Sequence, residues 1–491
     1  MMMLRSTRFI RLVLAAVFVV GPMATTAFSL SSAPANGIGR SSGGGGGGDN
    51  TSSNKFVILG GTGKIGTAVA SHLLQRSPSS RIVLVGRNKE KGEAAVQEVL
   101  SEHLDNVDSN RCPSVEWAYV DTVWKQDNEL LMGLLNDADC LIHTAGPYLG
   151  EEPFPLELAI AARCKAYVDV SDPLEYLEAS LELNDKARLA GTSALLSSGA
   201  FPGLSNVLAT EASSNLPKGT TVKDVRFNYF TAGLGGSGDV NLYITNLGFG
   251  EPMAQFEQGK LRMFQALSGL LLGKVSFFLD QEFDGFGFGN GVARQRLGTK
   301  TVFSWPFPEA ATVPRELGAV GDSHAAMGTA PDIWNDMLGI LVTIVPRPWW
   351  RSERFSQFLA DFSQPLVKFT DELLRLTSPD KVGETHAMRV DVVGMDGTAV
   401  SVVQAHESFR RCVGQSCAEF ALDLLEHPSP GVSLPEQRYG DASARKRMVK
   451  RLTSTSGTFA YTGPVTVKGT PKPTDLDGAI ERAVAAETAQ G

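Results

Sequence analysis

Three observations predict an α/β fold with an N-terminal doubly wound parallel sheet and a second α+β domain whose sheet is mostly antiparallel. Short apolar runs alternate with helical patterns between residues 55 and 214, as they do where each parallel strand is followed by a crossover helix. The first run ends in the glycine-rich turn Gly60-Gly-Thr-Gly-Lys-Ile-Gly66. Beyond residue 215, segments such as Val222–Thr231 alternate apolar and polar residues, which is typical of antiparallel strands.

The composition is that of an ordinary globular protein. The chain has 491 residues, of which 43% are hydrophobic and 20% charged, and its formal charge is −8. That charge gives no indication of a nucleic-acid partner, which usually requires a basic surface. Five scattered cysteines without a CxxC pair predict neither a disulfide scaffold nor a metal site.

The N-terminus has the character of a targeting leader. Three arginines precede the apolar run Leu12–Val20, which is too short to span a membrane and predicts a signal peptide over residues 1–27. Residues 28–54 form a Ser- and Gly-rich, acid-poor linker like a transit peptide, with Gly43–Gly48 as a flexible tether. The junction Ala24-Thr-Thr-Ala-Phe28 resembles the bipartite leaders of algae with complex plastids. We therefore expect a plastid protein, with the secretory pathway as the alternative.

Six short strands are expected in the first domain, residues 55–214, which has the pattern of a Rossmann domain. Polar or amphipathic helical segments separate them, so consecutive strands should run parallel. The expected strands are Lys55–Leu59, Arg81–Val85, Val115–Val120, Asp139–His143, Ala166–Val170 and Ser193–Ser197.

The glycine turn after the first strand predicts a dinucleotide site. The motif follows a strand and opens a helix, which is the context expected of a dinucleotide-binding motif. Its glycines are Gly60, Gly61, Gly63 and Gly66. Missing side chains let the backbone approach a pyrophosphate, and the helix N-terminus supplies oriented N–H groups. The cofactor-binding segment therefore also includes Thr62, Lys64 and Ile65.

The residues after the second strand indicate which dinucleotide is bound. An NAD site needs an acid there for the ribose 2′-hydroxyl, whereas this chain has Arg87, Asn88 and Lys89. A guanidinium can pair with a 2′-phosphate, so NADP(H) is preferred, with NAD(H) possible; the alternative is a solvated arginine. Asp121, after the third strand, either bonds the adenine amino group or caps the next turn.

A family resemblance rests on five segments in order. The glycine turn, Val85-Gly-Arg87, Ala145-Gly-Pro-Tyr148, Tyr167-Val-Asp-Val-Ser171 and Gly199-Ala-Phe-Pro-Gly203 resemble the saccharopine dehydrogenase-like oxidoreductases. The resemblance covers residues 55–215 well and extends more loosely to about residue 440. It implies an NAD(P)-binding Rossmann domain with an inserted second domain. Asp172-Pro173 departs from the Gly-Glu that relatives commonly have there, which favours a cyanobacterial and plastid branch over true saccharopine enzymes.

The loop after the fourth strand should pass beneath the nicotinamide ribose, because ligands bind outside the carboxyl ends of parallel strands. Ala145, Gly146 and Pro147 are therefore expected to contact the cofactor. A short-chain dehydrogenase would have a lysine four residues after a catalytic tyrosine, and no tyrosine in this chain does.

Candidates for proton transfer lie at the ends of strands facing the same crevice. Asp172 is the preferred acid/base, with Tyr148 orienting the substrate and Asp169 as the third catalytic candidate. Asp172 can equally be the N-cap of the helix that follows. His143 is expected to be a core histidine, and the helix start at Pro202-Gly203 can receive a substrate carboxylate or be an ordinary helix start.

The second domain is predicted over residues 215–440 as a substrate or dimerisation domain. Thr385–Val393 and Ala399–Ala405 flank Met395-Asp-Gly397 and predict a hairpin. Residues 334–354 combine an apolar run with tryptophans and arginines, which suits either peripheral membrane contact or a buried or dimer-forming helix. Residues 441–491 are expected to form a partly disordered tail.

The sequence thus predicts an NADP(H)-dependent oxidoreductase that transfers a hydride to or from an unidentified small or lipid-like substrate. Two alternatives remain: a non-catalytic, membrane-associated plastid assembly factor that keeps the nucleotide fold, and a true saccharopine dehydrogenase.

Overall fold

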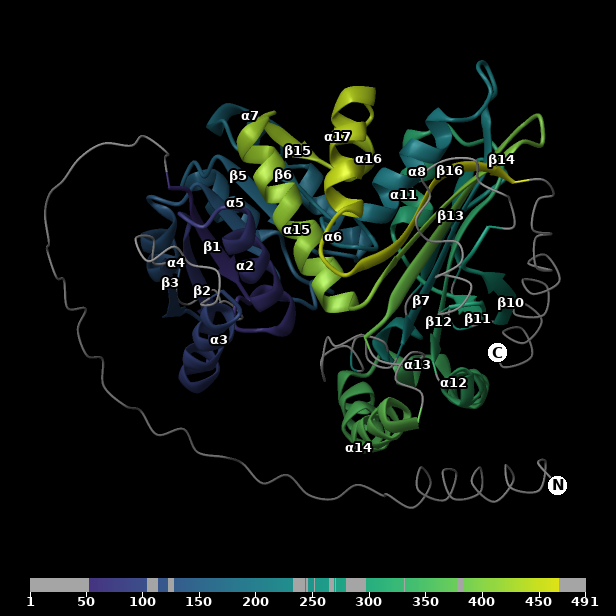
Figure 1. The fold of residues 1–491 in the computed structure, drawn as a ribbon, viewed down its shortest axis with the longest axis horizontal. Coiled ribbons are helices and arrows are strands. Elements are labelled where there is room, and N and C mark those ends of the chain that lie inside the picture. Colours follow the sequence, from purple (N-terminus) through teal and green to yellow (C-terminus); the bar gives the residue numbers. More distant parts are fainter. Residues whose placement is uncertain are drawn as a thin grey trace, which may run out of the picture. The chain divides into compact units, whose positions relative to one another are not determined.

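Two β-sheets and their covering helices make up the described part of the chain (Figure 1). The computed structural model describes residues 53–103, 114–121, 128–232, 243, 246–250, 252–264, 269, 271–279, 297–330, 332–377 and 384–467. The predicted signal peptide, 1–27, and nearly all of the predicted linker, 28–54, lie outside these residues.

The first sheet is parallel throughout and has seven strands in the order β15-β6-β5-β4-β1-β2-β3. All six predicted strands are present. Their bounds are β1 (Lys55–Leu59), β2 (Arg81–Gly86), β3 (Ser114–Tyr119), β4 (Cys140–His143), β5 (Ala166–Asp169) and β6 (Ser193–Leu195). The doubly wound Rossmann arrangement predicted from the strand–helix alternation is therefore confirmed.

Helices cover both faces of this sheet, as alternating side chains along β1 show. Phe56 and Ile58 pack into the cluster that includes α2 and α3, whereas Val57 and Leu59 pack on the opposite face against α4 and α5. The helices of this part are α2 (Lys64–Arg76), α3 (Lys89–Ser101), α4 (Asn128–Leu135), α5 (Phe154–Ala161), α6 (Leu174–Leu181), α7 (Asn184–Ala190) and α8 (Leu204–Ser214).

The seventh strand, β15 (Gly431–Ser433), comes from far along the chain. It pairs with β6, Gly431 opposite Ser193, and α15 (Phe409–Glu426), which precedes it, packs on α2. A Cβ added at Gly414 of α15 would lie 2.7 Å from the Ala68 Cβ, so the two helices are in close contact. The predicted boundary at residue 214 is therefore incomplete, because the chain returns to finish the first sheet. A three-residue strand carries no alternation that a sequence pattern could reveal.

The second sheet follows the order β10-β11-β12-β7-β13-β14-β16, with β8 and β9 joined through β12. It is antiparallel except for the β12–β7 pair. The strands are β7 (Val222–Ala232), β8 (Met253–Glu257), β9 (Lys260–Phe264), β10 (Leu271–Ser276), β11 (Thr299–Ser304), β12 (Ser323–Ala330), β13 (His386–Gly394), β14 (Ala399–His406) and β16 (Thr458–Val467). The predicted hairpin is β13–β14, and the mostly antiparallel second sheet is confirmed.

The predicted disordered tail is wrong for residues 441–467. Asp441 accepts backbone N–H groups from Ser443 and Ala444 and thereby starts α17 (Ala442–Thr453). Met448 and Leu452 are buried one turn apart on this helix, and the chain continues into β16 at the edge of the second sheet. Arg445, Arg447 and Arg451 of this helix form ion pairs with acidic side chains of other helices. Residues 468–491 lie outside the described residues.

The remaining helices accompany the second sheet. They are α11 (Glu309–Glu316), α12 (Asp332–Ile344), α13 (Arg347–Trp350), α14 (Glu353–Thr377) and α16 (Pro435–Arg438). The segment 334–354 is divided among α12, α13 and the start of α14, with Pro346 between α12 and α13. Among the described residues, no helix combines the length and the apolar character needed to cross a bilayer.

Candidate nucleotide-binding site

The turn between β1 and α2 is fixed by backbone hydrogen bonds. The Gly61 N–H lies 3.0 Å from the Ile58 carbonyl and 3.1 Å from that of Val85, which ties the turn to both β1 and β2. Gly60 has a φ of +71°, which favours glycine. The glycine positions predicted from the sequence thus form one compact turn at the carboxyl end of β1.

The same turn leaves no room for a side chain at its glycine positions. A Cβ at Gly66 would lie 2.5 Å from the Gly60 carbonyl oxygen, and one at Gly61 would lie 2.7 Å from that of Ile58. A Cβ at Gly60 would lie 2.8 Å from the Ala145 nitrogen, so the loop after β4 lies against this turn. The cradle therefore depends on glycine and brings the two predicted cofactor segments together.

Helix α2 points its N-terminus at this cradle. It begins at Lys64, its N-cap is Gly63, and no side chain caps it. Both Gly63 and Lys64 are exposed. Uncapped N–H groups with the positive end of the helix dipole bind anions well. The turn therefore fits the pyrophosphate of a dinucleotide, with Gly61, Gly63 and the first turn of α2 as the residues that would hold it.

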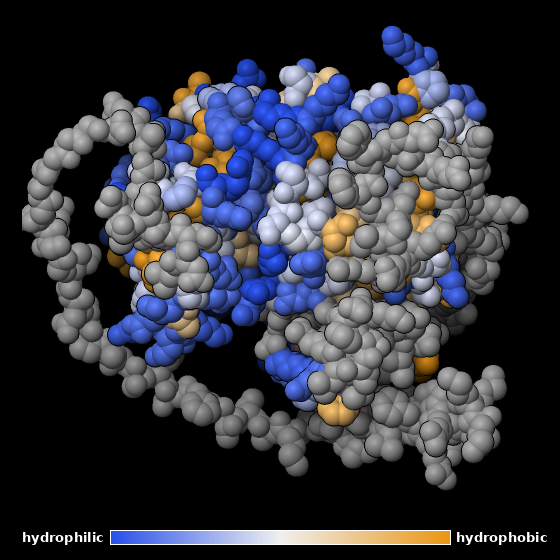
Figure 2. All heavy atoms as spheres, in the orientation of Figure 1, coloured by the Kyte–Doolittle hydropathy of each residue, from blue (hydrophilic) through white to orange (hydrophobic). Residues whose placement is uncertain are grey.

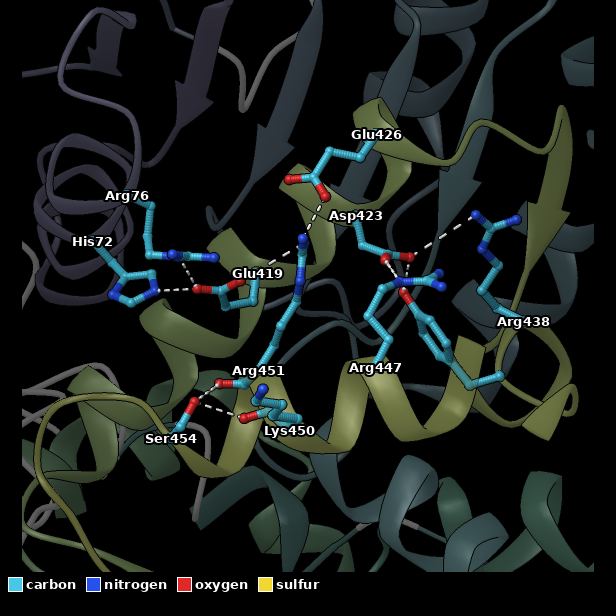
Figure 3. A network of polar contacts seen from close by, with 11 residues as sticks. His72, Arg76, Glu419, Asp423, Glu426, Arg438, Arg447, Lys450, Arg451 and Ser454 are labelled. Carbon is cyan, nitrogen blue, oxygen red and sulfur yellow. Dashed lines mark hydrogen bonds and ion pairs between the residues drawn. The ribbon is translucent and has the colours of Figure 1, made fainter. Parts of the chain in front are cut away.

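A polar network holds the far end of α2 against helices from the end of the chain (Figure 3). Glu419 of α15 is hydrogen bonded to His72 at 2.8 Å and to Arg76 at 2.7 Å, both on α2. Arg451 of α17 lies 3.9 Å from the other Glu419 oxygen and also pairs with Glu426. Glu419 is buried, and the neighbouring cations hold the pKa of its carboxyl below the usual range although burial opposes them.

A second carboxylate continues this network along α15. Asp423 is fully buried and accepts from Arg447 of α17 at 2.9 Å and from the Tyr439 hydroxyl at 3.1 Å. Arg438 lies 4.0 Å from the same carboxylate (Figure 3). The pyrophosphate-facing helix is thus fixed through α15 to α17.

The residues predicted to select NADP(H) lie at the end of β2. Arg87 is exposed, and the strand residue before it, Gly86, lies close to Thr62 of the glycine turn. Asn88 caps α3 by accepting the Lys91 N–H at 2.8 Å, which gives it a structural role at the predicted site. Lys89 lies 3.8 Å from Glu93, and Asp121 follows β3 and is partly exposed.

Asp169, at the end of β5, is fully buried and joins neighbouring strands. Its Oδ1 accepts from the Ser171 hydroxyl at 2.6 Å and from the Ser197 N–H at 2.9 Å, and its Oδ2 accepts from Tyr167 at 3.1 Å. Burial raises the pKa of Asp169 despite these hydrogen bonds. Its catalytic role stays a prediction, since every contact described is within the protein.

Tyr148 lies in the interior. It is 3% exposed, and its hydroxyl donates to the His143 carbonyl at 2.7 Å. Its ring meets those of His143 and Tyr176 edge to face. His143 is buried too, as expected of a core histidine, and burial lowers its pKa to about 4. The described contacts do not place the Tyr148 hydroxyl in an open crevice.

The N-cap residue of helix α6 is Pro173, which makes no side-chain capping hydrogen bond. The alternative that Asp172 is the N-cap residue is therefore wrong. Asp172 is partly exposed. Burial raises the pKa of Glu309 on α11 to about 8, and the charge of Asp172 adds to that rise.

The start of α8 cannot receive a substrate carboxylate. Residues 199–210 are buried, and the Gly203 N–H donates to the Asn206 side chain at 2.9 Å. The Asn206 amide in turn donates to Glu436 at 2.8 Å. This helix start is capped within the fold. In the part of the chain that the structure describes, no cluster of His, Cys, Asp or Glu side chains is arranged to hold a metal ion.

Comparison with known proteins agrees with this geometry. Residues 56–195 match the family described as saccharopine dehydrogenase NADP binding domain. No curated protein matches the sequence. The structure is similar to that of apo histidine-tagged saccharopine dehydrogenase (L-Glu forming) from Saccharomyces cerevisiae, with 12% identity and a TM-score of 0.54 over 85% of this chain and 100% of that chain. This likeness shows that the fold extends over both sheets.

Weaker structural likenesses cover other dehydrogenases. GenD2 from gentamicin A biosynthesis in complex with NAD is 11% identical over 87% of this chain and 99% of that chain, with a TM-score of 0.33. A metagenomic short-chain oxidoreductase in complex with NADP is 17% identical over 29% of this chain and 80% of that chain, with a TM-score of 0.23. Their TM-scores are too low to bear on function.

Proposed function

We propose that the chain is an NADP(H)-dependent oxidoreductase that transfers a hydride to or from a small or lipid-like substrate. The match of residues 56–195 to the saccharopine dehydrogenase NADP binding domain supports this proposal. The observation that carries this proposal is the glycine cradle, which is closed to side chains and faces the uncapped start of α2. When bound there, the cofactor supplies or accepts the hydride.

Arg87 supports the choice of NADP(H) over NAD(H). It is exposed and follows β2 beside the glycine turn, where the 2′-phosphate of NADP(H) would bind. The chain offers no acid at this position that could accept a ribose 2′-hydroxyl.

The test compares Arg87→Ala with the unchanged protein by NADPH and NADH fluorescence titration. Loss of a charge-assisted contact worth roughly 1.5–3 kcal/mol should weaken NADPH binding about 10- to 100-fold and leave NADH nearly unchanged. Arg163→Ala, which alters an exposed arginine outside the predicted site, is the matched control. Equal losses for both cofactors would overturn the assignment, and no binding of either would overturn the proposed function.

A membrane-associated role is the second candidate, and a group of exposed apolar side chains favours it. They lie on α12, α13 and α14, and the clearest members are Ile340, Ile344, Trp349, Phe358, Phe362 and Phe369. Phe358 and Phe362 are one turn apart with stacked rings, and Phe369 lies two turns further along the same helix face. Figure 2 shows a pale orange area over α14.

Flotation with anionic and neutral liposomes tests this candidate. Interfacial binding through this face predicts that the protein floats with the vesicles, and that Trp349→Ser with Phe369→Ser abolishes flotation without changing NADPH affinity. A protein that stays at the bottom of the gradient with both vesicle types would exclude the role. If this face instead forms a homodimer, light scattering should show a dimer for the unchanged protein and a monomer for the double variant.

We also propose delivery to a plastid by residues 1–54, on the strength of the signal-peptide pattern and the junction at Phe28. A fluorescent fusion of residues 1–54 in a diatom tests it. Plastid fluorescence that changes to endoplasmic reticulum fluorescence in Phe28→Ala is the expected result, and secretion of the unchanged fusion would contradict it.

A further inference from the structure

Strand β3 ends in an aromatic side chain that is open to solvent. Tyr119, its last residue, is 53% exposed, and its side chain makes no hydrogen bond or ring contact with the described residues. Trp117, two residues earlier on the same face of the strand, is packed instead, since a Cβ added at Gly92 of α3 would lie 2.6 Å from its ring. Helix α3 therefore covers this face of β3 at Trp117 and leaves the Tyr119 ring exposed.

The register of the first sheet places Tyr119 beside the predicted cofactor site. Strands β2 and β3 are parallel, Tyr119 is opposite Gly86, and the Val120 N–H lies 3.2 Å from the Gly86 carbonyl oxygen. Gly86 has no side chain, and a Cβ added there would lie 2.5 Å from the Thr62 hydroxyl oxygen of the glycine turn. Because register partners in a parallel sheet point to the same face, Thr62 and the Tyr119 ring lie on one face, on either side of Gly86.

Three neighbouring strand ends thus carry three different features of the predicted site. The strand order is β1-β2-β3, with the glycine turn after β1, Arg87 after β2 and Tyr119 at the end of β3. Neighbouring strands lie about 4.8 Å apart, so Tyr119 lies about 10 Å from the end of β1. In a dinucleotide, the ribose that carries the 2′-phosphate lies between the pyrophosphate and the adenine. With the pyrophosphate at the turn and the 2′-phosphate at Arg87, the adenine extends to Tyr119.

We propose that the Tyr119 ring is the surface on which the adenine of the bound cofactor stacks. The proposal rests on the proposed function and deepens it, because it names the contact to the base. An aromatic ring binds the flat face of a purine by stacking, which requires no hydrogen bond. The nicotinamide half is expected on the other side of the turn, where the loop after β4 lies against Gly60. An exposed ring at the end of β3 is therefore placed for the adenine half alone.

Tyr119→Ala tests the proposal without a substrate. NADPH and NADH both carry adenine, so fluorescence titration of the full chain should show that this variant binds both cofactors about 5- to 100-fold more weakly. Arg87→Ala, by contrast, should weaken NADPH alone, so the two variants differ in their effect on NADH. Leu189→Ala is the control, because this α7 side chain is 88% exposed and lies at the opposite edge of the sheet, beside β15. It should bind both cofactors like the unchanged protein.

Two further measurements assign the effect to the ring and to the base. Tyr119→Phe keeps the aromatic face and loses the hydroxyl, so it should bind NADPH like the unchanged protein. Adenosine 2′,5′-bisphosphate has the adenine but no nicotinamide, and its affinity is measured by displacement of NADPH. Tyr119→Ala should weaken the binding of this fragment by the same factor as that of NADPH, because both lose the same contact.

NADPH affinity that is unchanged in Tyr119→Ala overturns the stacking contact while leaving the proposed function standing. An equal loss in Tyr119→Phe also overturns it, because the contact would then belong to the hydroxyl. Unchanged binding of the bisphosphate does so too, because the contact would then belong to the nicotinamide half. Circular dichroism checks that each variant is folded, and if Tyr119→Ala is not, Tyr119→Leu, which has bulk but no aromatic face, replaces it. Failure of the unchanged protein to bind NADPH overturns the proposed function itself.

Discussion

His72 and Glu419 are hydrogen bonded at 2.8 Å although 347 residues separate them in the chain. The first belongs to the helix that starts at the glycine cradle, and the second to the helix that leads the chain back into the first sheet. Both side chains are at most 5% exposed. The nucleotide-binding helix is therefore held in place by a buried polar contact with the last third of the sequence.

Removing Glu419 should destabilise the protein strongly. Glu419→Ala leaves His72 and Arg76 without their shared acceptor, and breaking a buried ion pair in this way costs about 3–5 kcal/mol. Urea unfolding followed by circular dichroism measures the change. Glu157→Ala removes a surface contact 3.9 Å from Lys186 and should cost less than about 1 kcal/mol. Equal effects of the two variants would contradict the structural role of the network.

Gly66→Ala should disable the cradle. Its Cβ would lie 2.5 Å from both the Gly60 carbonyl oxygen and the Gly61 Cα, so the turn must shift away from the position that admits a pyrophosphate. We expect NADPH affinity to fall at least about 10-fold, or roughly 1.4 kcal/mol. Gly133→Ala is the control, because a Cβ there meets nothing within 4 Å on helix α4. That substitution should raise stability by about 0.4–1 kcal/mol and leave binding unchanged.

The nucleotide half of the fold was predictable because its signals are local. Each strand from β1 to β6 is a short apolar run beside a helical pattern, and the glycine turn requires specific residues at fixed spacing. The close approach of Ala145 to Gly60 followed from one rule, that the carboxyl ends of parallel strands share an edge.

What the sequence could not reveal depends on contacts distant along the chain. Glu309 follows Trp305-Pro-Phe-Pro308 and gives no pattern beyond that of an acid at a helix start. Only the fold brings it to Tyr229 of β7, with which it is hydrogen bonded. Likewise, α17 gave no local sign of its packing, because Glu419, Asp423 and Glu426, which pair with its arginines, lie on another helix.

Stability should fall as the pH drops below about 6.5. Burial lowers the pKa of His143, His324 and His406 to about 4 and that of His386 to about 3. Their folded-state pKa values lie below the unfolded value of about 6.5, so protons bind preferentially to the unfolded chain. Each histidine can remove up to about 1.4 kcal/mol per pH unit between pH 6.5 and 4. Urea unfolding at pH 7, 6 and 5 measures the slope, and a flat profile would contradict the burial of these rings.

Glu309 should produce the opposite slope on the alkaline side. Its folded-state pKa of about 8 lies above the unfolded value, so its stabilising protonation is complete below pH 4.5 and is lost as the pH rises through 8. Glu309→Gln stays neutral and can still accept from Tyr229, so it should unfold at a higher temperature than the unchanged protein at pH 8. Calorimetry at pH 6 and pH 8 checks this. A variant that is equally destabilised at both pH values would show that Glu309 is ionised throughout.

The four described cysteines should be unreactive in the folded protein. Cys140, Cys164, Cys412 and Cys417 are buried, and burial raises the pKa of each thiol. Because the thiolate is the reactive form, alkylation with iodoacetamide at pH 8 should modify them only after denaturant is added. Peptide mapping by mass spectrometry identifies the modified residues. Rapid labelling of Cys417 without denaturant would contradict the burial of this α15 residue.

Strand β15 has a consequence for how the protein folds while it is being synthesised on the ribosome. The β6 edge and the α2 surface are covered by segments that are translated only after strands β7 to β14 of the second sheet, as the bond from the Ser429 N–H to Ser193 across 236 residues illustrates. A chain that folds from its N-terminus as it emerges must therefore keep an unfinished sheet edge and an apolar helix face open for most of its synthesis. The half that carries the glycine turn is therefore completed late, although its first strand is translated first.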